Sequence, residues 1–490
     1  MNAVMDLSAV FARFSAFERD AGLFSRELCG VRFWHLIRNQ LYAADLLPQM
    51  VGMDNPHPDV ILGVAARKRL PLSTRAADVL FGNPRFALKG RNVLFSLTPR
   101  LAKGPGGEQL RLMLDWFLPR LKSSFAVLER DLVAGVRTCH DGCGRKFRWA
   151  VVERKVSRYR ATEAFKAFKP EIDAAAEALV DEIGAALGVS LPASRMASKL
   201  GAAVAYDRVG VKELKAWLVR LRTRCVVEVV HYGMMNLLLS KSARELGIPS
   251  VELQHGTVYP AHVAYNLPVS DSPYSPDFFL AWGDWWIGQT RNFPARRAVS
   301  TGYPFLEDAL ARHPRKPRDE APRVLFISQG TIGKRLSELA VELCRIMGPA
   351  CQVTFKPHPN ETKSWRTLYP ALADSGVEVA EDATRGIYSW LAESDAVAGV
   401  YSTAMIEGLV WGARAYVFRS LPGADTMSSF CSSGAAEYVE GAEDLAARLR
   451  ILFSANAGGA TSFNKSDFFA DNAAANIVAA IDRIVEGKEP

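Results

Sequence analysis

Two histidines stand at the ends of apolar segments that read as strands. "VELQHG" places His255 beside a glycine, and "TFKPHP" places His358 between two prolines. An imidazole titrates near neutral pH, so it can take a proton from a hydroxyl or help to hold a phosphate. Gly256 leaves room for a substrate beside His255. The pattern predicts that both histidines face one ligand; the alternative is that they are polar loop residues or satisfied core histidines.

Residues near His358 favour a phosphate ligand. Lys356 lies two positions earlier and points to the same side of an extended strand. In "GVYSTAMIEG", Ser402 and Thr403 end a strand and open a helix, where hydroxyls and unpaired backbone N–H groups can bind an anion. Glu407 falls on the same helix face as Thr403 and is predicted to hold ribose hydroxyls. The alternative is an ordinary helix cap with Glu407 satisfied locally.

The loop after the strand at 323–329 adds groups to the same edge. Its sequence "SQGTIGKR" contributes Gly330, Thr331 and Lys334 to the predicted nucleotide and phosphate site. The spacing of glycines and lysine is not that of a complete phosphate-binding loop, so the loop alone is a weak signal.

A second candidate base follows a neighbouring strand. In "VVEVVHYG", Glu228 stands mid-strand and is expected to be structural, whereas His231 is placed to reach a ligand. We expect His255 ahead of His231 as the base, because Gly256 leaves space beside it.

Strand-like and helix-like segments alternate through the C-terminal half. Strands of four to eight apolar residues followed by helices indicate a parallel sheet covered on both faces, and ligands bind such sheets outside the carboxyl ends of the strands. The predicted strands are "RVLFISQ" (323–329), "CQVTFKPHP" (351–359), "VEVAE" (377–381), "DAVAGVYS" (395–402) and "RAYVFR" (414–419).

The first half repeats this alternation. Its predicted strands are "RNVLFSL" (91–97), "CVVEVVHYG" (225–233), "GIPSVELQHG" (247–256), "DFFLAWGD" (277–284) and "AVSTGYP" (298–304). Residues 103–222 read mostly as helix and are predicted to be an insertion. The expected organisation is therefore an α/β domain over 1–310, a linker rich in proline and charge over 311–323, a second α/β domain over 324–465, and a helix over 466–490 that packs back toward the first domain.

The composition of the chain limits the class of protein to which it can belong. The chain has 490 residues, 49% of them hydrophobic and 23% charged, as in a soluble globular protein. The pattern predicts neither a spanning helix nor a signal peptide, and scattered cysteines indicate a reducing compartment. The cluster "CHDGC" (139–143) has too few ligands for a zinc site. We expect a cytoplasmic protein.

Charge is unevenly divided. Residues 1–250 hold 38 Lys and Arg against 24 Asp and Glu, while residues 251–490 hold 22 against 28. The basic half is expected to attract an anionic glycan acceptor or an anionic membrane surface, where the protein would sit peripherally. The alternative is a solvated basic face. No recognition helix, zinc finger or aromatic strand signature points to nucleic acid.

The order of short motifs resembles a known family. "QHGT", "WGD", "GYP", "KPHP" and "STAMIEG" follow one another over about residues 225–420 as in GT-B glycosyltransferases of bacterial surface and capsule polysaccharide synthesis. The most similar groups are capsule transferases that use CMP-activated Kdo or sialic acid, and CDP-glycerol glycerophosphotransferases. The resemblance implies two doubly wound Rossmann-like domains facing across a cleft, with no counterpart for residues 103–222.

The resemblance also implies roles. His358, Ser402 and Thr403 match the residues that hold the nucleotide phosphate, and His255 matches a histidine near the acceptor, beside Gln254, Gly256 and Tyr303. The chemistry then needs a base on the acceptor hydroxyl and cations on the departing phosphate, and the sequence offers no Asp-x-Asp pair for a metal. We expect a metal-independent transferase with a nucleotide sugar as co-substrate, CMP-linked as the resemblance implies, and no other cofactor.

Two alternatives remain open from the sequence. A nucleotide-sugar 2-epimerase would share the architecture, but it needs several carboxylates around the sugar and no basic acceptor domain. A non-catalytic nucleotide-binding protein of polysaccharide assembly would bind the nucleotide without releasing it.

Overall fold

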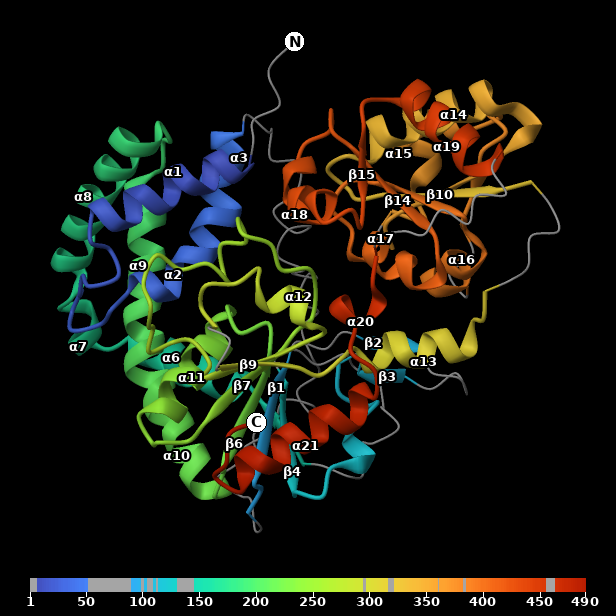
Figure 1. The fold of residues 1–490 in the computed structure, drawn as a ribbon. Coiled ribbons are helices and arrows are strands. Elements are labelled where there is room, and N and C mark those ends of the chain that lie inside the picture. Colours follow the sequence, from blue (N-terminus) through green and yellow to red (C-terminus); the bar gives the residue numbers. More distant parts are fainter. Residues whose placement is uncertain are drawn as a thin grey trace. The chain divides into compact units, whose positions relative to one another are not determined.

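The computed structural model describes residues 7–51, 90–97, 101–103, 109–111, 113–129, 145–293, 297–315, 321–359, 361–381, 385–454 and 463–490. The chain divides into two compact units, each built on one large parallel sheet (Figure 1). The N-terminal unit consists mainly of Phe11–Val258, His262–Phe305 and Phe469–Pro490, and the C-terminal unit mainly of Leu306–Phe468.

The N-terminal unit has a seven-stranded sheet in the order β5-β4-β1-β6-β7-β8-β9, with every neighbouring pair parallel. Its strands are β1 (Val93–Leu97), β4 (Phe125–Glu129), β5 (Arg145–Arg148), β6 (Cys225–Val229), β7 (Ser250–Leu253), β8 (Phe278–Ala281) and β9 (Ala298–Ser300). A separate antiparallel pair is formed by β2 (Leu101–Lys103) and β3 (Gln109–Arg111). All carboxyl ends of the parallel strands meet at one edge, which we call the N-unit exit edge.

Helices cover both faces of this sheet (Figure 1). The described helices before residue 300 are α1 (Leu7–Asp20), α2 (Trp34–Leu41), α3 (Leu47–Met50), α6 (Ala150–Arg160), α7 (Glu163–Lys166), α8 (Lys169–Leu187), α9 (Ala193–Tyr206), α10 (Lys212–Leu221), α11 (Met234–Arg244) and α12 (Asp284–Ile287). The next helix, α13 (Pro304–Arg312), belongs mainly to the C-terminal unit. Two π-helical turns, η1 (Tyr42–Leu46) and η4 (Asp207–Val211), and the 3₁₀ turn η3 (Leu118–Arg120) interrupt or join them.

The C-terminal helix α21 (Ala473–Val485) completes the core of the N-terminal unit. Its buried face, which includes Ile477 and Ile481, packs with valines and leucines of β1, β4, β6 and β7. The approach is close at Gly302, where a Cβ would lie 2.2 Å from the carbonyl oxygen of Ala470 and where φ is +92°. A side chain at that position would therefore push the returning segment off the sheet.

The C-terminal unit has a six-stranded parallel sheet in the order β12-β11-β10-β13-β14-β15. Its strands are β10 (Arg323–Ile327), β11 (Gln352–Lys356), β12 (Glu378–Val379), β13 (Ala396–Gly399), β14 (Arg414–Phe418) and β15 (Glu437–Val439). The helices are α14 (Gly333–Met347), α15 (Trp365–Leu368), α16 (Ile387–Glu393), α17 (Thr403–Gly408), α18 (Ser428–Ser432), α19 (Ala442–Ser454) and α20 (Lys465–Phe468). Its carboxyl ends form the C-unit exit edge.

These two parallel sheets confirm the predicted fold class in that the chain contains two Rossmann-like α/β units. The helical reading of 103–222 is wrong for its first part, because β4 and β5 belong to the main sheet and the helices begin at Ala150. β5, "RKFR", is a charged edge strand without the apolar pattern of an inner strand, whereas β4, "FAVLE", is a buried inner strand that the prediction missed. The strand β15 was also not predicted.

Some predictions fall outside the described residues. The cysteine cluster 139–143 lies there, as do residues 316–320 of the predicted linker. The described parts of that linker are not all irregular, since Arg312 ends α13 and Arg323 opens β10. Among the described helices, none combines the length and the apolar character needed to cross a bilayer.

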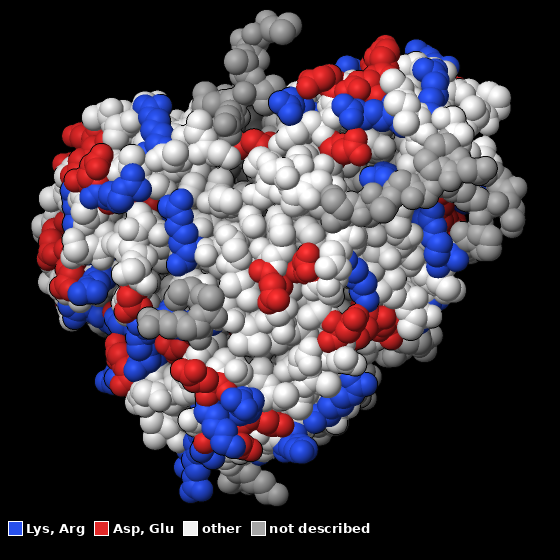
Figure 2. Space-filling view, in the orientation of Figure 1, with Lys and Arg blue, Asp and Glu red and all other residues white. Residues whose placement is uncertain are grey.

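Figure 2 shows how charge is distributed over one face of the molecule. Blue and red side chains are interspersed over the helical part of the N-terminal unit, at the left of the view. The basic excess of the first half therefore does not form a single basic patch on this face.

Candidate functional site at the strand exits

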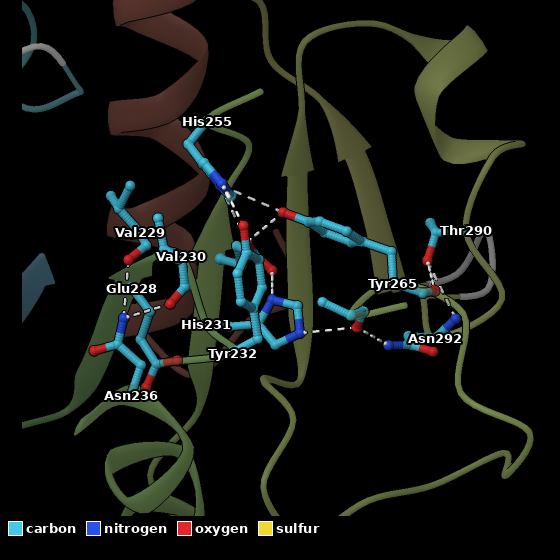
Figure 3. Close-up of polar contacts among 12 residues, drawn as sticks. Glu228, Val229, Val230, His231, Tyr232, Asn236, His255, Tyr265, Thr290 and Asn292 are labelled. Atoms are coloured by element: carbon cyan, nitrogen blue, oxygen red, sulfur yellow. Dashed lines mark hydrogen bonds and ion pairs between the residues drawn. The ribbon is translucent and has the colours of Figure 1, made fainter. Parts of the chain in front are cut away.

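The chain leaves β6 through a strained turn. Val230, directly after the strand, has a φ of +64°, a left-handed conformation that is unfavourable for a β-branched residue. Asn236 of α11 holds this turn by donating from Nδ2 to the carbonyl oxygens of Val229 (2.9 Å) and Val230 (3.0 Å). The next two residues, His231 and Tyr232, are thereby placed at the N-unit exit edge (Figure 3).

Glu252 of β7 is the centre of this edge. Its side chain is fully buried, and its Oε2 pairs with Nδ1 of His231. Oε1 accepts a 2.5 Å hydrogen bond from the hydroxyl of Tyr265 and lies 3.7 Å from Nδ1 of His255. Burial alone would raise the pKa of Glu252, but His231 and His255 outweigh burial and lower the pKa to about 2. Glu252 is therefore a buried carboxylate that stays ionised.

His231 is fixed by both ring nitrogens. Nε2 lies 3.2 Å from the carbonyl oxygen of Ala264, which can only accept, so Nε2 carries a hydrogen. Nδ1 faces the carboxylate of Glu252. Only 3% of the His231 side chain is exposed, so this residue orients and compensates Glu252 rather than contacting a substrate. That His231 acts as a second base stays a prediction, and its burial argues against direct contact with a substrate.

His255 lies further from the buried carboxylate of Glu252 than His231 does. Its Nδ1 faces the hydroxyl of Tyr265 at 3.4 Å, and its Nε2 lies 3.1 Å from the hydroxyl of Tyr232. Because the Tyr265 proton is donated to Glu252, its oxygen is left to accept from Nδ1–H of His255. This assigns the hydrogen to Nδ1 and leaves the lone pair of Nε2 directed at Tyr232, the arrangement of a general base backed by a carboxylate (Figure 3).

The loop that carries Tyr265 is anchored at several points. Asn292 donates to the carbonyl oxygen of Ala264 (2.9 Å), and Thr290 donates to that of Tyr265 (2.7 Å). In the same loop, His262 Nδ1 accepts from the backbone N–H of Ala264 at 3.3 Å. Burial, with the neighbouring histidines His255 and His231, lowers the pKa of His262 to about 3, so this imidazole is neutral. The position of Tyr265 is therefore fixed by hydrogen bonds within this loop region as well as by its contact with the sheet residue Glu252.

Glu228 is structural, as the sequence indicated. It is the register partner of Glu252 on the adjacent strand, is fully buried, and accepts a 3.0 Å hydrogen bond from Ser240 of α11. Burial raises its pKa well above the usual value, and the charge of Glu252 adds to this. Of the two neighbouring carboxyl groups, Glu228 thus keeps its proton and Glu252 does not.

Two of the residues predicted to lie beside the acceptor, Gln254 and Tyr303, are buried and contact other residues of the protein. Gln254 is 2% exposed and bridges its own turn, donating to the carbonyl oxygen of Gly256 (2.9 Å) and accepting from the backbone N–H of Trp282 (2.8 Å). Tyr303 is buried and stacks on Trp282 with ring centroids 4.3 Å apart. Gln254 shapes the turn that presents His255, and Tyr303 supports Trp282.

The C-unit exit edge joins the ends of β11, β10 and β13, which are neighbours in the sheet. Lys356 ends β11 half-buried, and burial lowers its pKa. Within the described residues its ammonium has neither an ion pair nor a hydrogen bond. At the end of β10, the side-chain oxygen Oε1 of Gln329 is buried without a hydrogen-bond partner in the described part of the chain. Such unsatisfied groups are expected where a ligand completes the site.

Hydroxyls lie at the same edge. Thr331 and Tyr401 hydrogen bond through their hydroxyls, which ties the loop after β10 to the loop after β13. Ser402 precedes α17 without capping it through its side chain. Neither Ser402 nor Thr403 makes a side-chain hydrogen bond within the residues described, so the simple cap expected as the alternative is not formed.

The remaining predicted residues of this unit are placed as follows. His358 is half-buried, and its backbone N–H donates to Glu361 (3.2 Å) in a tight turn after β11. Gly330 is exposed on the loop into α14, and Lys334 is exposed in the first turn of that helix. Glu407 is buried and hydrogen bonds with Tyr388; burial raises its pKa to about 7. The sheet thus brings Lys356, His358, Thr331, Ser402 and Thr403 to one edge, while Glu407 points into the core.

Sequence reasoning missed the tyrosines and the central carboxylate. Tyr232 directly follows His231, and Tyr265 lies in a loop without periodicity. Glu252 carried a usable signal, because a lone acidic residue inside the apolar strand "VEL" must be paired or protonated. No group of three or more His, Cys, Asp or Glu with metal-binding geometry occurs among the described residues.

The chain is thus a two-sheet Rossmann-like α/β protein with polar sites at the strand exits. No family model matches it, and no curated protein matches its sequence. Solved structures of similar fold include UDP-GlcNAc 2-epimerase of Methanocaldococcus jannaschii in complex with UDP-GlcNAc and UDP (10% identity, 79% of this chain and 98% of that chain covered, TM-score 0.45). Another is MurG of Acinetobacter baumannii (12% identity, 80% and 99% covered, TM-score 0.48). At these identities the similarity concerns the fold.

Proposed function

We propose that the protein is an enzyme that takes a sugar from a nucleotide-activated donor and transfers it to a hydroxyl of an acceptor glycan. The observation that carries this proposal is the Nε2 lone pair of His255, held by the tautomer that Tyr265 and Glu252 impose. Such a base removes the proton of an attacking hydroxyl, which general base catalysis requires.

The C-unit exit edge supports the donor half of the proposal. A half-buried lysine without a counter-ion, the unsatisfied oxygen of Gln329 and the hydroxyls of Ser402 and Thr403 suit a nucleotide phosphate. Lys356 then stabilises the negative charge that builds on the departing phosphate. His358 and Lys334 are assigned to the same nucleotide site, as is Glu407, although its carboxyl is buried against Tyr388.

Epimerisation of a nucleotide sugar is the second candidate. The observation that favours it is the pairing of two protic side chains, since the rings of Tyr232 and His262 lie 5.8 Å apart beside His255. An enzyme that removes and returns a proton at one carbon needs two such groups. Against it, two carboxyl groups of this edge, Glu228 and Glu252, are fully buried and unable to contact a sugar.

The test is turnover with CMP-, CDP- and UDP-activated donors, with and without an acidic or lipid-linked glycan. Transfer predicts nucleotide release that depends on the acceptor, whereas an epimerase interconverts the donor sugar without an acceptor. Nucleotide binding without either reaction would favour the non-catalytic alternative. A CMP-activated sugar acid is the donor we expect first.

The same assay tests the base. We expect His255→Ala to reduce kcat by about 10²–10⁴, the range of general acid–base contributions. His313→Ala is the matched control, because His313 lies in the other unit and its backbone rather than its ring meets Trp411. Full activity of His255→Ala would contradict the proposed base.

The nature of the acceptor and the location of the protein are also proposals. An anionic or lipid-linked glycan, and peripheral contact with an anionic membrane, are supported by the basic excess of residues 1–250. Flotation with vesicles containing anionic lipid, at low and at high salt, measures that contact; protein that never floats at low salt would contradict it.

A further inference from the structure

Tyr232 contacts the ring nitrogen of His255 that the proposed function uses as the base. The side chain of His255 is 7% exposed, and His255 and Tyr232 are both half-buried residues. The hydroxyl of Tyr232 is 3.1 Å from Nε2, the nitrogen that carries the lone pair. The lone pair is therefore directed at the Tyr232 hydroxyl, which lies where a proton on its way to Nε2 can pass.

The hydrogen bonds around Tyr232 run in one direction. Tyr232 donates to Nε2 of His255, Nδ1–H of His255 donates toward Tyr265, and Tyr265 donates to Glu252. Glu252 is an acceptor at the inner end, compensated by His231. Positive charge that arrives on His255 therefore faces a buried carboxylate, as in a catalytic triad.

The fold keeps the Tyr232 ring in place. Its centroid lies 5.4 Å from that of His231, 5.8 Å from those of both His255 and His262, and 6.3 Å from that of Tyr265. These four rings surround it, so a rotation out of the way would break several aromatic contacts.

The backbone before Tyr232 is also specialised. The left-handed turn at Val230 costs energy that is tolerated only where surrounding structure enforces it, and Asn236 supplies that enforcement with two hydrogen bonds. Ser96 of β1 in turn orients Asn236 by donating to its Oδ1 at 2.5 Å. The strained turn directs two consecutive side chains, His231 and Tyr232, into the hydrogen-bonded network around Glu252 and His255.

We propose that Tyr232 is a catalytic residue that relays the proton from substrate to His255, an inference that rests on the proposed transferase function. The acceptor O–H gives its proton to Oη of Tyr232 while the Tyr232 proton passes to Nε2 of His255. The acceptor oxygen forms its bond to the anomeric carbon, and the bond from that carbon to the phosphate oxygen breaks with its electron pair on the leaving phosphate. His255 ends as an imidazolium beside the carboxylate of Glu252.

The relay is tested by changing the phenol without removing the ring. We expect Tyr232→Phe to lower kcat by about 100-fold or more, in the range of proton-transfer catalysis, with KM for the donor unchanged. Fluorotyrosines placed at position 232 keep the shape but make the phenol more acidic, and we expect kcat to change progressively with the number of fluorines. A merely structural hydroxyl would leave kcat independent of fluorination.

The control is Tyr438→Phe, which removes a tyrosine hydroxyl that donates to the carbonyl oxygen of Ala424 at 3.1 Å in the other unit. It should retain wild-type kcat. Unchanged or increased kcat in Tyr232→Phe, with His255→Ala inactive, would overturn the relay and leave the proposed function standing. Absence of turnover by the wild-type protein with every donor would overturn the proposed function itself, and the relay with it.

Discussion

The two exit edges differ in how far the protein satisfies its own polar groups. At the N-unit exit edge, Glu252, His231, His255 and Tyr265 form a closed hydrogen-bonded network around a buried charge. At the C-unit exit edge, Lys356 and the side-chain oxygen of Gln329 lack partners among the described residues. A network that is complete without ligand fixes protonation states, and an incomplete one gains its partners from a ligand. The same kind of sheet thus supports two kinds of site.

The difference extends to buried carboxylates. In the N-terminal unit, two histidines lower the pKa of Glu252 to about 2. In the C-terminal unit, burial raises the pKa of Glu407 to about 7. Glu252 therefore favours folding as a charged group, whereas Glu407 opposes folding once it ionises. The two should respond to substitution and to pH in opposite directions.

The largest effect is expected for Glu252→Gln. It replaces the carboxylate that His231 and Tyr265 contact with a neutral amide, and removing one partner of a buried pair costs about 3–5 kcal/mol. Urea unfolding followed by tryptophan fluorescence at pH 7 measures the loss. The stability that Glu252 contributes is present above its ordinary pKa of 4.5 and disappears as the pH falls toward 2, so the variant should match wild type at the acid end.

The control for that experiment is Glu342→Gln, whose partner Arg335 lies 3.0 Å away on the surface with 52% of its side chain exposed. It should change the unfolding free energy by less than about 1 kcal/mol. Equal losses for the two variants would mean that the Glu252 network is no stronger than a surface ion pair.

Glu407→Gln should act in the opposite direction. Because the pKa of Glu407 is raised from 4.5 to about 7, the carboxyl favours folding below 4.5 and loses this as the pH rises through 7. The glutamine keeps a partner for Tyr388 and never ionises, so we expect the variant to be more stable by about 3 kcal/mol at pH 8 and equal to wild type at pH 4. A variant less stable than wild type at pH 8 would contradict this assignment.

Lys356→Met tests whether the C-unit exit edge binds the nucleotide. Loss of a hydrogen bond from a charged donor is worth about 1.5–3 kcal/mol, so we expect nucleotide to bind about 10- to 100-fold more weakly. Calorimetric titration with CMP and with UDP gives the affinity. Arg345→Met, an exposed cation in the last turn of α14, should bind as wild type. If both variants bind equally well, Lys356 is not a ligand of the nucleotide.

The smallest effect is expected for Tyr303→Phe. The ring stays stacked on Trp282, so stability should change by less than about 1 kcal/mol and the KM for the acceptor should not change. Steady-state kinetics with varied acceptor measures this. A clear rise in that KM would restore the acceptor contact predicted from the sequence for Tyr303.

Much of the fold could be predicted because inner parallel strands are buried on both faces. β6, β10, β11, β13 and β14 are near-continuous apolar runs and were read directly. The edge strands β5 and β15 were not, because one side of an edge strand is open and needs no apolar pattern. The inner strand β4 is an exception, because it was missed although it is buried.

For the site, strand ends could be predicted and partners could not. His255 and His358 were found because each follows an apolar strand. Their neighbours Tyr265 and Glu361 come from irregular turns, whose placement depends on tertiary anchors such as Asn292. That the two histidines share one ligand stays a prediction.

The return of α21 to the first sheet has a consequence for synthesis of the chain. Ile477, Ile481 and Ile484 close a core whose other members, such as Val93 and Val227, emerge from the ribosome hundreds of residues earlier. The N-terminal unit therefore cannot bury that face of its sheet until residues near 485 have been translated. The sheet of the unit encoded later is built from strands contiguous between Arg323 and Val439, so all of it is translated before α21 and is free to form first.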